Sequence, residues 1–250
     1  MPFLDDISPA HYALALFGAF CLGFSKTGFP GLALINVLLM AELFGAKASI
    51  GLILPLLIVC DLIVYPLFRK YASWRQVLPL VLPSVAGIFV GYFLLKEISD
   101  LTARRTIGGI ILFMLALQAL RTYFKNFLQN LPDSKSFLHG SGLTIGVATM
   151  MANAAGPVYS IYALVHRMEK TDFLGIGARF FLFLNVFKIP FMTDLQIINP
   201  WSLKIGLTLL PGIFLGIFLG RRLIAKIPQN LFELLLYFFS LVAGLRLLFF

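Results

Sequence analysis

Charged residues are scarce in this sequence, and their scarcity excludes an ordinary soluble domain. Only 12% of the 250 residues are charged and 60% are apolar, with a mean hydropathy of +0.93. A soluble domain carries about 25% charged residues. We therefore predict an all-α membrane protein with several spans and no room for a soluble domain between them.

Cysteine is rare as well, and its positions argue against a disulfide framework or a metal site. Cys21 and Cys60 both lie inside apolar runs, where cysteine usually behaves as a small hydrophobic residue. The three histidines lie near the ends of apolar segments. No phosphate-binding loop or nucleophile triad is visible. We therefore expect no enzyme activity, no catalytic residues, no cofactor and no metal.

The excess of basic residues points to a membrane rather than to nucleic acid. The formal net charge is +9, and the lysines and arginines concentrate in short connections between apolar runs. That distribution is typical of membrane orientation and of contact with anionic lipid. We expect membrane lipid as a partner and no nucleic acid.

Long apolar runs dominate the chain. A helix needs about 20 apolar residues to cross a bilayer. Eight segments approach or exceed this length, and the first and fifth are interrupted, which predicts seven or eight transmembrane segments. The segments are 10–41, 48–68, 75–95, 104–124, 137–165, 173–193, 202–220 and 230–250.

The interruptions in the first and fifth segments predict a site. Residues 23–31 and 149–157 combine glycine, proline and small polar residues. Proline removes a backbone donor and glycine lowers helix stability, so the helix should break at both places. Broken backbone at membrane depth is tolerated only where it is buried in protein or lines a watery cavity.

The two halves of the chain have the same layout. Each opens with a broken segment, and each has a tryptophan, Trp74 or Trp201, before a third segment with glycines at four-residue spacing. This order predicts two homologous repeats of four segments, residues 1–125 and 137–250, joined by a polar connector at 126–136. Paired broken helices in corresponding positions are a mark of secondary transporters.

The charge distribution leaves two topologies open. If all eight segments cross the membrane, the basic residues divide almost evenly between the two sides. If the two broken segments are re-entrant, the basic loops at 69–75, 121–135, 167–170 and 221–226 share one side, as the positive-inside rule favours. The re-entrant arrangement also makes the two repeats inverted, and we prefer it.

Four charged residues lie well inside apolar segments and are candidates for function: Lys26, Asp61, Arg179 and Lys188. Each costs about 2.5–3.5 kcal/mol at the centre of a helix on insertion scales. Asp61 is either a proton carrier or counterion in a site or one half of a structural pair. Lys26 is an anion ligand or reaches toward an interface, and Arg179 is a secondary cation of the site or a structural residue.

A small anion is the ligand that this pattern favours. A half-helix that begins after a break presents free N–H groups and a partial positive charge. Asn185 and Lys188 are three residues apart and so share one helix face. We expect a net positive cavity whose binding residues are Lys26, Thr27, Asn153, Ala154, Gly156, Asn185 and Lys188.

These stretches resemble the TauE/SafE family of sulfite exporters over nearly the whole chain. The resemblance rests on the broken first segment and on residues 54–61, 149–157 and 185–190. The first break departs from the family, whose members are often richer in glycine than residues 25–31 of this chain. Positions that match those shared in the family are Asp61, Asn153, Gly156, Pro157, Asn185 and Lys188.

The resemblance implies a multi-pass transporter of the bacterial inner membrane. Its substrate would be sulfite or an organosulfonate, moved outward by alternating access. Independently of the resemblance, an inside-negative membrane potential suffices to drive the export of an anion, and coupling to protons through Asp61 is a separate hypothesis. Uptake of an organosulfonate or other small organic anion stays open as an alternative, as do a membrane assembly or scaffold protein without transport and a homo-oligomeric state.

Overall fold

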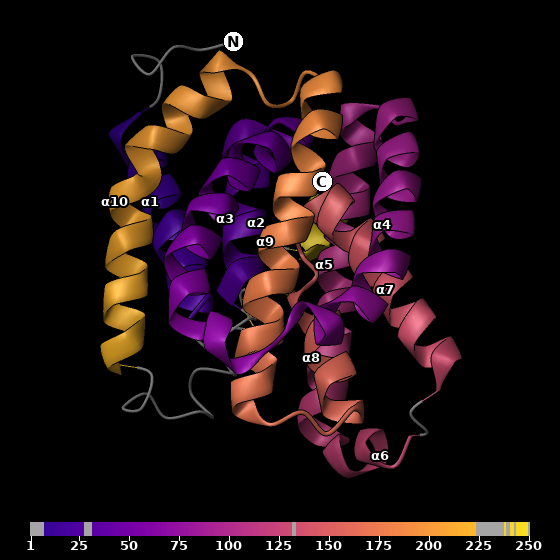
Figure 1. Ribbon diagram of the computed structural model, residues 1–250. Coiled ribbons are helices and arrows are strands. Elements are labelled where there is room, and N and C mark those ends of the chain that lie inside the picture. Colours follow the sequence, from indigo (N-terminus) through magenta and orange to yellow (C-terminus); the bar gives the residue numbers. More distant parts are fainter. Residues whose placement is uncertain are drawn as a thin grey trace.

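The computed structural model describes residues 8–27, 32–131, 134–223, 238, 241–242 and 244–249, and its regular structure there is helical (Figure 1). A short 3₁₀ turn, η2 (Arg69–Tyr71), follows the third helix. The α-helices are α1 (Pro9–Ser25), α2 (Leu32–Phe44), α3 (Ala46–Phe68), α4 (Trp74–Glu97), α5 (Asp100–Tyr123), α6 (Lys125–Gln129), α7 (Lys135–Ala152), α8 (Gly156–Val165), α9 (Lys170–Asp194) and α10 (Pro200–Leu223).

Five of the described helices are long and apolar enough to cross a membrane, namely Ala46–Tyr71 (taken together with η2), Trp74–Glu97, Asp100–Tyr123, Thr171–Asp194 and Pro200–Arg222. The helices α1, α2 and α8 are apolar but shorter. This confirms the prediction of an all-helical protein with several membrane-spanning segments. Most of the expected eighth segment, and residues 28–31 of the first break, lie outside the described residues.

Several helix starts follow from local sequence. Ser99 and Ser134 accept hydrogen bonds from the backbone N–H groups three residues later, which satisfies donors that have no partner within the helix. Ser73 and Gln76 form a capping box at the start of α4. These caps place the helix ends within a few residues of the expected segment ends.

The chain turns back at each expected break. Between α7 and α8, Asn153 adopts a left-handed conformation (φ 52°, ψ 29°) that ends α7, and Pro157 lies in the first turn of α8. Between α1 and α2 the break begins at Lys26, where the last turn of α1 closes. Because the chain reverses, α2 packs beside α1 and α8 beside α7.

The opening helix of each half packs against the third long segment of the other half. Figure 1 shows α1 beside α10 and α4 beside α7, at opposite flanks of the molecule. Glycines permit both contacts. A Cβ on Gly146 of α7 would collide with the Ser84 carbonyl of α4, and a Cβ on Gly216 of α10 would collide with the Phe20 carbonyl of α1. Such close approach is typical of membrane helices.

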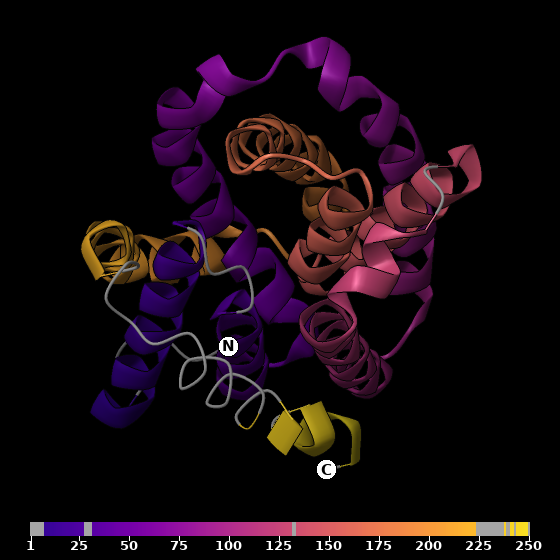
Figure 2. The same cartoon turned by 90° about the horizontal axis from the view of Figure 1, so that it is seen from below.

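The long helix α9 occupies the middle of the bundle. Seen from below, it is surrounded by the chain that runs from α3 through η2 to α4 (Figure 2), and it contacts all three. Aromatic rings fill the contacts, including Phe183 against Trp74 and Phe191 against Phe89. A polar side chain on the inner face of α9 is therefore enclosed by other helices.

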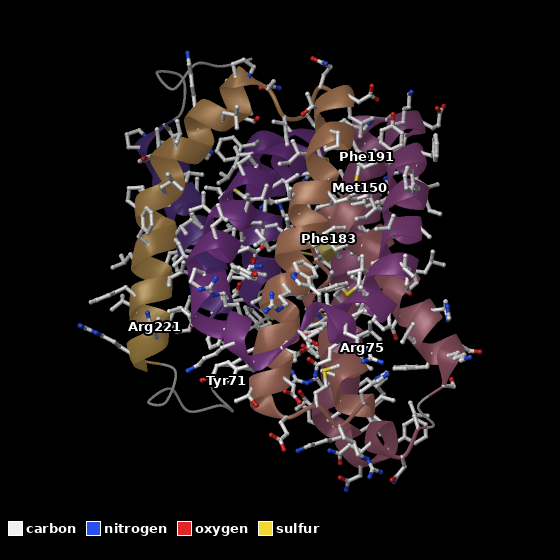
Figure 3. The ribbon with its side chains drawn as sticks, viewed as in Figure 1. Tyr71, Arg75, Met150, Phe183, Phe191 and Arg221 are labelled. Carbon is white, nitrogen blue, oxygen red and sulfur yellow. The ribbon has the colours of Figure 1, made fainter. Side chains whose placement is uncertain are left out.

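The connections with the most basic residues lie at one end of the molecule. Figure 1 shows α6, the α8–α9 connection and the C-terminal end of α10 at its lower end. Figure 3 places the labelled Tyr71, Arg75 and Arg221 toward that end as well, away from Phe191. The C-terminal residues pack against α5, where a Cβ on Gly108 would approach the backbone of Leu248 and Gly244.

Candidate functional site

A cavity of about 110 Å³ lies where the two breaks meet α3 and α9. One buried water needs only about 10–15 Å³ of such volume, whereas drug-sized ligands occupy pockets of roughly 300–1,000 Å³. The cavity therefore suits a small molecule or ion with a few waters. Its polar lining residues are Ser25, Lys26, Asp61, Thr149, Asn153, Tyr159 and Asn185.

Asp61 of α3 is the centre of the polar lining. Its side chain is almost fully buried, and each carboxylate oxygen has a donor. Lys26 Nζ lies 2.6 Å from Oδ1, and Asn185 Nδ2 donates to Oδ2 at 2.6 Å. The carboxylate thus joins the end of α1 to the middle of α9. The pair with Lys26 lies in the cavity lining, so it fits both a counterion in a site and a structural pair.

Lys26 is the cation that faces the cavity. It retains a side-chain exposure of 17%, and its ammonium group lies 5.2 Å above the ring of Phe181. An ammonium over an aromatic face is attracted by the ring quadrupole. Lys26 therefore has one strong partner, Asp61, and one weak partner, Phe181, and it is positioned to donate to a bound anion.

Lys188 is also inside the bundle, but it lies behind the cavity wall. Its side chain is fully buried, and Nζ donates to Thr149 O, Thr149 Oγ1 and Asn153 Oδ1 at 3.0, 2.9 and 2.7 Å. All three acceptors belong to the last turn of α7 and the residue that ends it. A cation there complements the negative end of the helix. Lys188 thus holds the second break in place.

Asn153 connects the break to α3. While its Oδ1 accepts from Lys188, its Nδ2 donates to the Ile50 carbonyl at 3.0 Å. Both polar ends of the side chain are therefore engaged within the protein. Asn153 lines the cavity but is held in place by these two contacts.

Arg179 lies outside the cavity lining. Its guanidinium donates to the carbonyl oxygens of Ala72 and Arg69 at 2.8 and 2.6 Å and to the Tyr65 hydroxyl at 2.9 Å. It also stacks near the Tyr65 and Trp74 rings. These bonds tie α9 to the turn between α3 and α4. They favour a structural role for Arg179 over a role as a second cation of the site.

The structure brings some of the expected binding residues together and separates others. Lys26, Asn153, Gly156 and Asn185 all line the cavity, together with Asp61. Thr27, Ala154 and Lys188 are not part of the lining. Thr27 instead donates to the Phe24 carbonyl and packs next to Gly220, and Ala154 is buried beside the break.

The cavity wall carries one cation and one carboxylate, whereas the sequence predicts a net positive cavity. The difference arises because Asp61 pairs with Lys26 inside the cavity while Lys188 lies behind Thr149 and Asn153. Positive potential also comes from the start of α8, where Gly156 lines the cavity. The first N–H groups of a helix have no partner within it and attract anions.

Sequence reasoning misses the aromatic part of the lining. Phe181 and Tyr159 form one wall, with Phe173 nearby. The Tyr159 hydroxyl donates to the Phe173 carbonyl at 2.7 Å. Phe181 could have been predicted from helical periodicity, because it lies four residues before Asn185 and so on the same face of α9. Tyr159 gives no such signal, since its direction depends on how α8 packs.

The donors that line the cavity are of the kinds that small anions use. Over the part of the chain that the structure describes, no group of three or more histidine, cysteine, aspartate or glutamate side chains could hold a metal ion. The cavity offers an ammonium, an amide and a helix start as donors. These groups suit oxyanion oxygens.

The family model described as Sulfite exporter TauE/SafE matches residues 14–247. No curated protein and no solved structure matched the chain.

Proposed function

The chain belongs to the TauE/SafE sulfite exporter family, and from this premise we propose that it is a secondary transporter that exports sulfite or a small organosulfonate by alternating access. The observation that carries the proposal is the cavity between the two breaks, where Lys26, Asn185 and the start of α8 converge. The membrane it occupies would be a bacterial inner membrane.

The proposed site uses the expected residues in different roles. Lys26 and Asn185 donate to the anion, and Gly156 supplies the helix start. Lys188 and Asn153 keep the second break in the shape that forms the cavity. Arg179 acts through the turn beside η2 and has no direct contact with the anion.

The movement would be that of one repeat against the other. The packing of α1 on α10 and of α7 on α4 supports two inverted repeats, 1–125 and 137–250, with the connector 126–136 between them. The gathering of basic connections at one end in Figure 1 supports re-entrant broken segments with that end in the cytoplasm. Transporters built from such repeats bind substrate near the middle of the membrane, between the repeats.

Flux into proteoliposomes tests the proposal. Purified full-length protein should transport radiolabelled sulfite with saturable kinetics, and an excess of a small organosulfonate should compete. Protein that is monodisperse and thermally stable but gives no saturable flux of sulfite or of a sulfonate would contradict it. That result would instead favour the scaffold reading.

A further inference from the structure

We propose that, when no substrate is bound, the Asp61 carboxylate occupies the position of the substrate anion. A substrate anion then binds only when Asp61 takes up a proton. The inference rests on the proposed function and adds the coupling ion. Its basis is that both carboxylate oxygens are held, at 2.6 Å each, by Lys26 and Asn185, two of the donors that an oxyanion in this cavity would need.

Carboxylates and sulfur oxyanions compete for the same donors. Each presents negatively charged oxygens to ammonium and amide N–H groups, and charge-assisted hydrogen bonds of this kind are among the strongest in proteins. Asp61 is part of the chain and almost fully buried, so it is always close to Lys26. An anion must displace it to reach these two donors, whereas the side chains of Ser25, Asn153 and Tyr159 already donate to backbone carbonyls.

Electrostatic repulsion disfavours an ionised Asp61 and a bound anion in the same site. Lys26 is the single cation among the described lining residues, and two negative charges beside it would repel each other. Protonation of Asp61 removes both obstacles at once. It ends the repulsion, and it frees the Lys26 ammonium and the Asn185 amide for the anion.

Few other charged groups act on Asp61. Lys188 of α9 interacts electrostatically with both Asp61 and Lys26 from behind the wall. Arg179, also on α9, is tied to backbone carbonyls near η2. The neighbouring Cys60 is a buried thiol, and Tyr159 of α8 reaches the cavity with its hydroxyl already bonded to Phe173 O.

The remaining elements that pack on α3 direct their charges elsewhere. Glu42 of α2 pairs with Arg104 of α5 and with Arg246. The charged residues of η2 and those described on α10 are exposed, and they are Arg69, Lys70, Lys204, Arg221 and Arg222. Among the lining residues that the structure describes, Asp61 is therefore the only carboxylate, which assigns the proton to it.

The cycle balances in charge and protons. A proton from water adds to an Asp61 oxygen, the contacts with Lys26 and Asn185 break, and both donors bind the anion. On the other side of the membrane the anion leaves, the proton returns to water, and the ion pair forms again. One proton thus travels with each anion, and the movement of a monovalent anion is electroneutral. Membrane potential then does no work on the pair, and export follows the concentration gradients of the anion and the proton.

Methanesulfonate is the probe of choice because it stays ionised at all relevant pH values, so that only the protein titrates. In proteoliposomes of the full chain, its apparent affinity should fall by up to about tenfold for each unit by which the pH is raised, because one proton must bind with each anion. A pH dye inside the vesicles should report one proton entering with each anion.

Asp61→Asn should bind methanesulfonate at least as tightly as the wild type does at low pH, with no pH dependence and no proton movement. The matched control is Asp194→Asn, because Asp194 is an exposed carboxylate on α9 that bonds Tyr92 outside the cavity. This control should keep the pH slope and the proton count of the wild type.

Two results would overturn the inference and leave the proposed function standing. One is saturable wild-type transport whose affinity is flat with pH and carries no proton. The other is a folded Asp61→Asn protein that no longer binds the anion. If that variant fails to fold, the wild-type proton count decides alone. No saturable flux of any sulfur anion by folded wild type would remove both proposals.

Discussion

A lysine stands at each of the two chain breaks, and the two are held in opposite ways. Lys26, at the end of α1, faces the cavity and pairs with a carboxylate that can change its charge. Lys188 is fully buried at the end of α7 and donates to three oxygens, none of them from a carboxylate. A charge at membrane depth is therefore a poor guide to function until its partners are known. The partners show that Lys26 is placed to donate to a ligand, whereas Lys188 stabilises the end of α7.

The largest effect on stability should come from removing Lys188, which holds the end of α7. Lys188→Met removes the donor to the buried Thr149 Oγ1 and Asn153 Oδ1, whereas the Thr149 carbonyl keeps the backbone N–H of Asn153. A buried acceptor left without its donor costs about 1–3 kcal/mol. We expect a sharp fall in thermal stability and in monodisperse yield, measured by melting in detergent.

The matched control is Lys204→Met, which removes an exposed lysine from α10. It should change stability by about 0.5 kcal/mol or less. Equal melting curves for the two variants would show that Lys188 does not hold the break.

Removal of the cavity cation should affect binding more than folding. Lys26→Met loses a charge-assisted hydrogen bond to the anion worth about 1.5–3 kcal/mol, so apparent affinity for sulfite should fall roughly 10–100-fold. Concentration-dependent flux measures the change.

The double variant Lys26→Met/Asp61→Asn separates the two roles of the pair. Lys26→Met alone leaves the buried carboxylate without its cation, and the added Asp61→Asn removes that charge. Stability should recover while binding stays weak. Recovery of binding as well would mean that Lys26 serves only to neutralise Asp61.

A smaller effect should follow loss of the aromatic wall. Phe181→Ala removes the ring beneath Lys26, and a cation–π contact is worth about 0.5–2 kcal/mol, so affinity should fall about 2- to 30-fold. Phe183→Ala is the matched control, because Phe183 (Figure 3) is on the same helix and packs on Trp74 and Phe187 instead. A larger loss of affinity in the control would contradict the placement of the site.

The smallest effect should come from Thr27. Its hydroxyl donates to the Phe24 carbonyl and its side chain faces α10. Thr27→Val loses about 0.5–1.5 kcal/mol of stability for the missing hydrogen bond and leaves affinity unchanged. A tenfold loss of affinity in well-folded Thr27→Val would return this residue to the site.

The helices were predictable from the sequence because the bilayer sets their length. The expected segments 48–68 and 75–95 correspond to α3 (Ala46–Phe68) and α4 (Trp74–Glu97). The break at Asn153–Ala155 was predictable because Gly156 and Pro157 follow it. Hydropathy and helix-breaking residues are local properties, and they suffice for the positions of helices.

The partners of the buried charges were not predictable in the same way. Lys26 and Asp61 are 35 residues apart, and their contact depends on how α1 packs on α3. Asn185 and Lys188 share a face of α9, yet one reaches Asp61 and the other reaches the end of α7. A helix face is wide enough to serve two neighbours, so the spacing alone does not say which side chain meets a ligand.

The most direct test of the account is sulfite flux in proteoliposomes by wild type, Lys26→Met and Lys188→Met, each expressed per amount of monodisperse folded protein. We predict saturable flux for the wild type, a loss of roughly tenfold or more at low sulfite for Lys26→Met, and most of the flux retained by whatever Lys188→Met protein folds. Flux by Lys26→Met equal to that of the wild type, or no saturable flux from well-folded wild type, would contradict it.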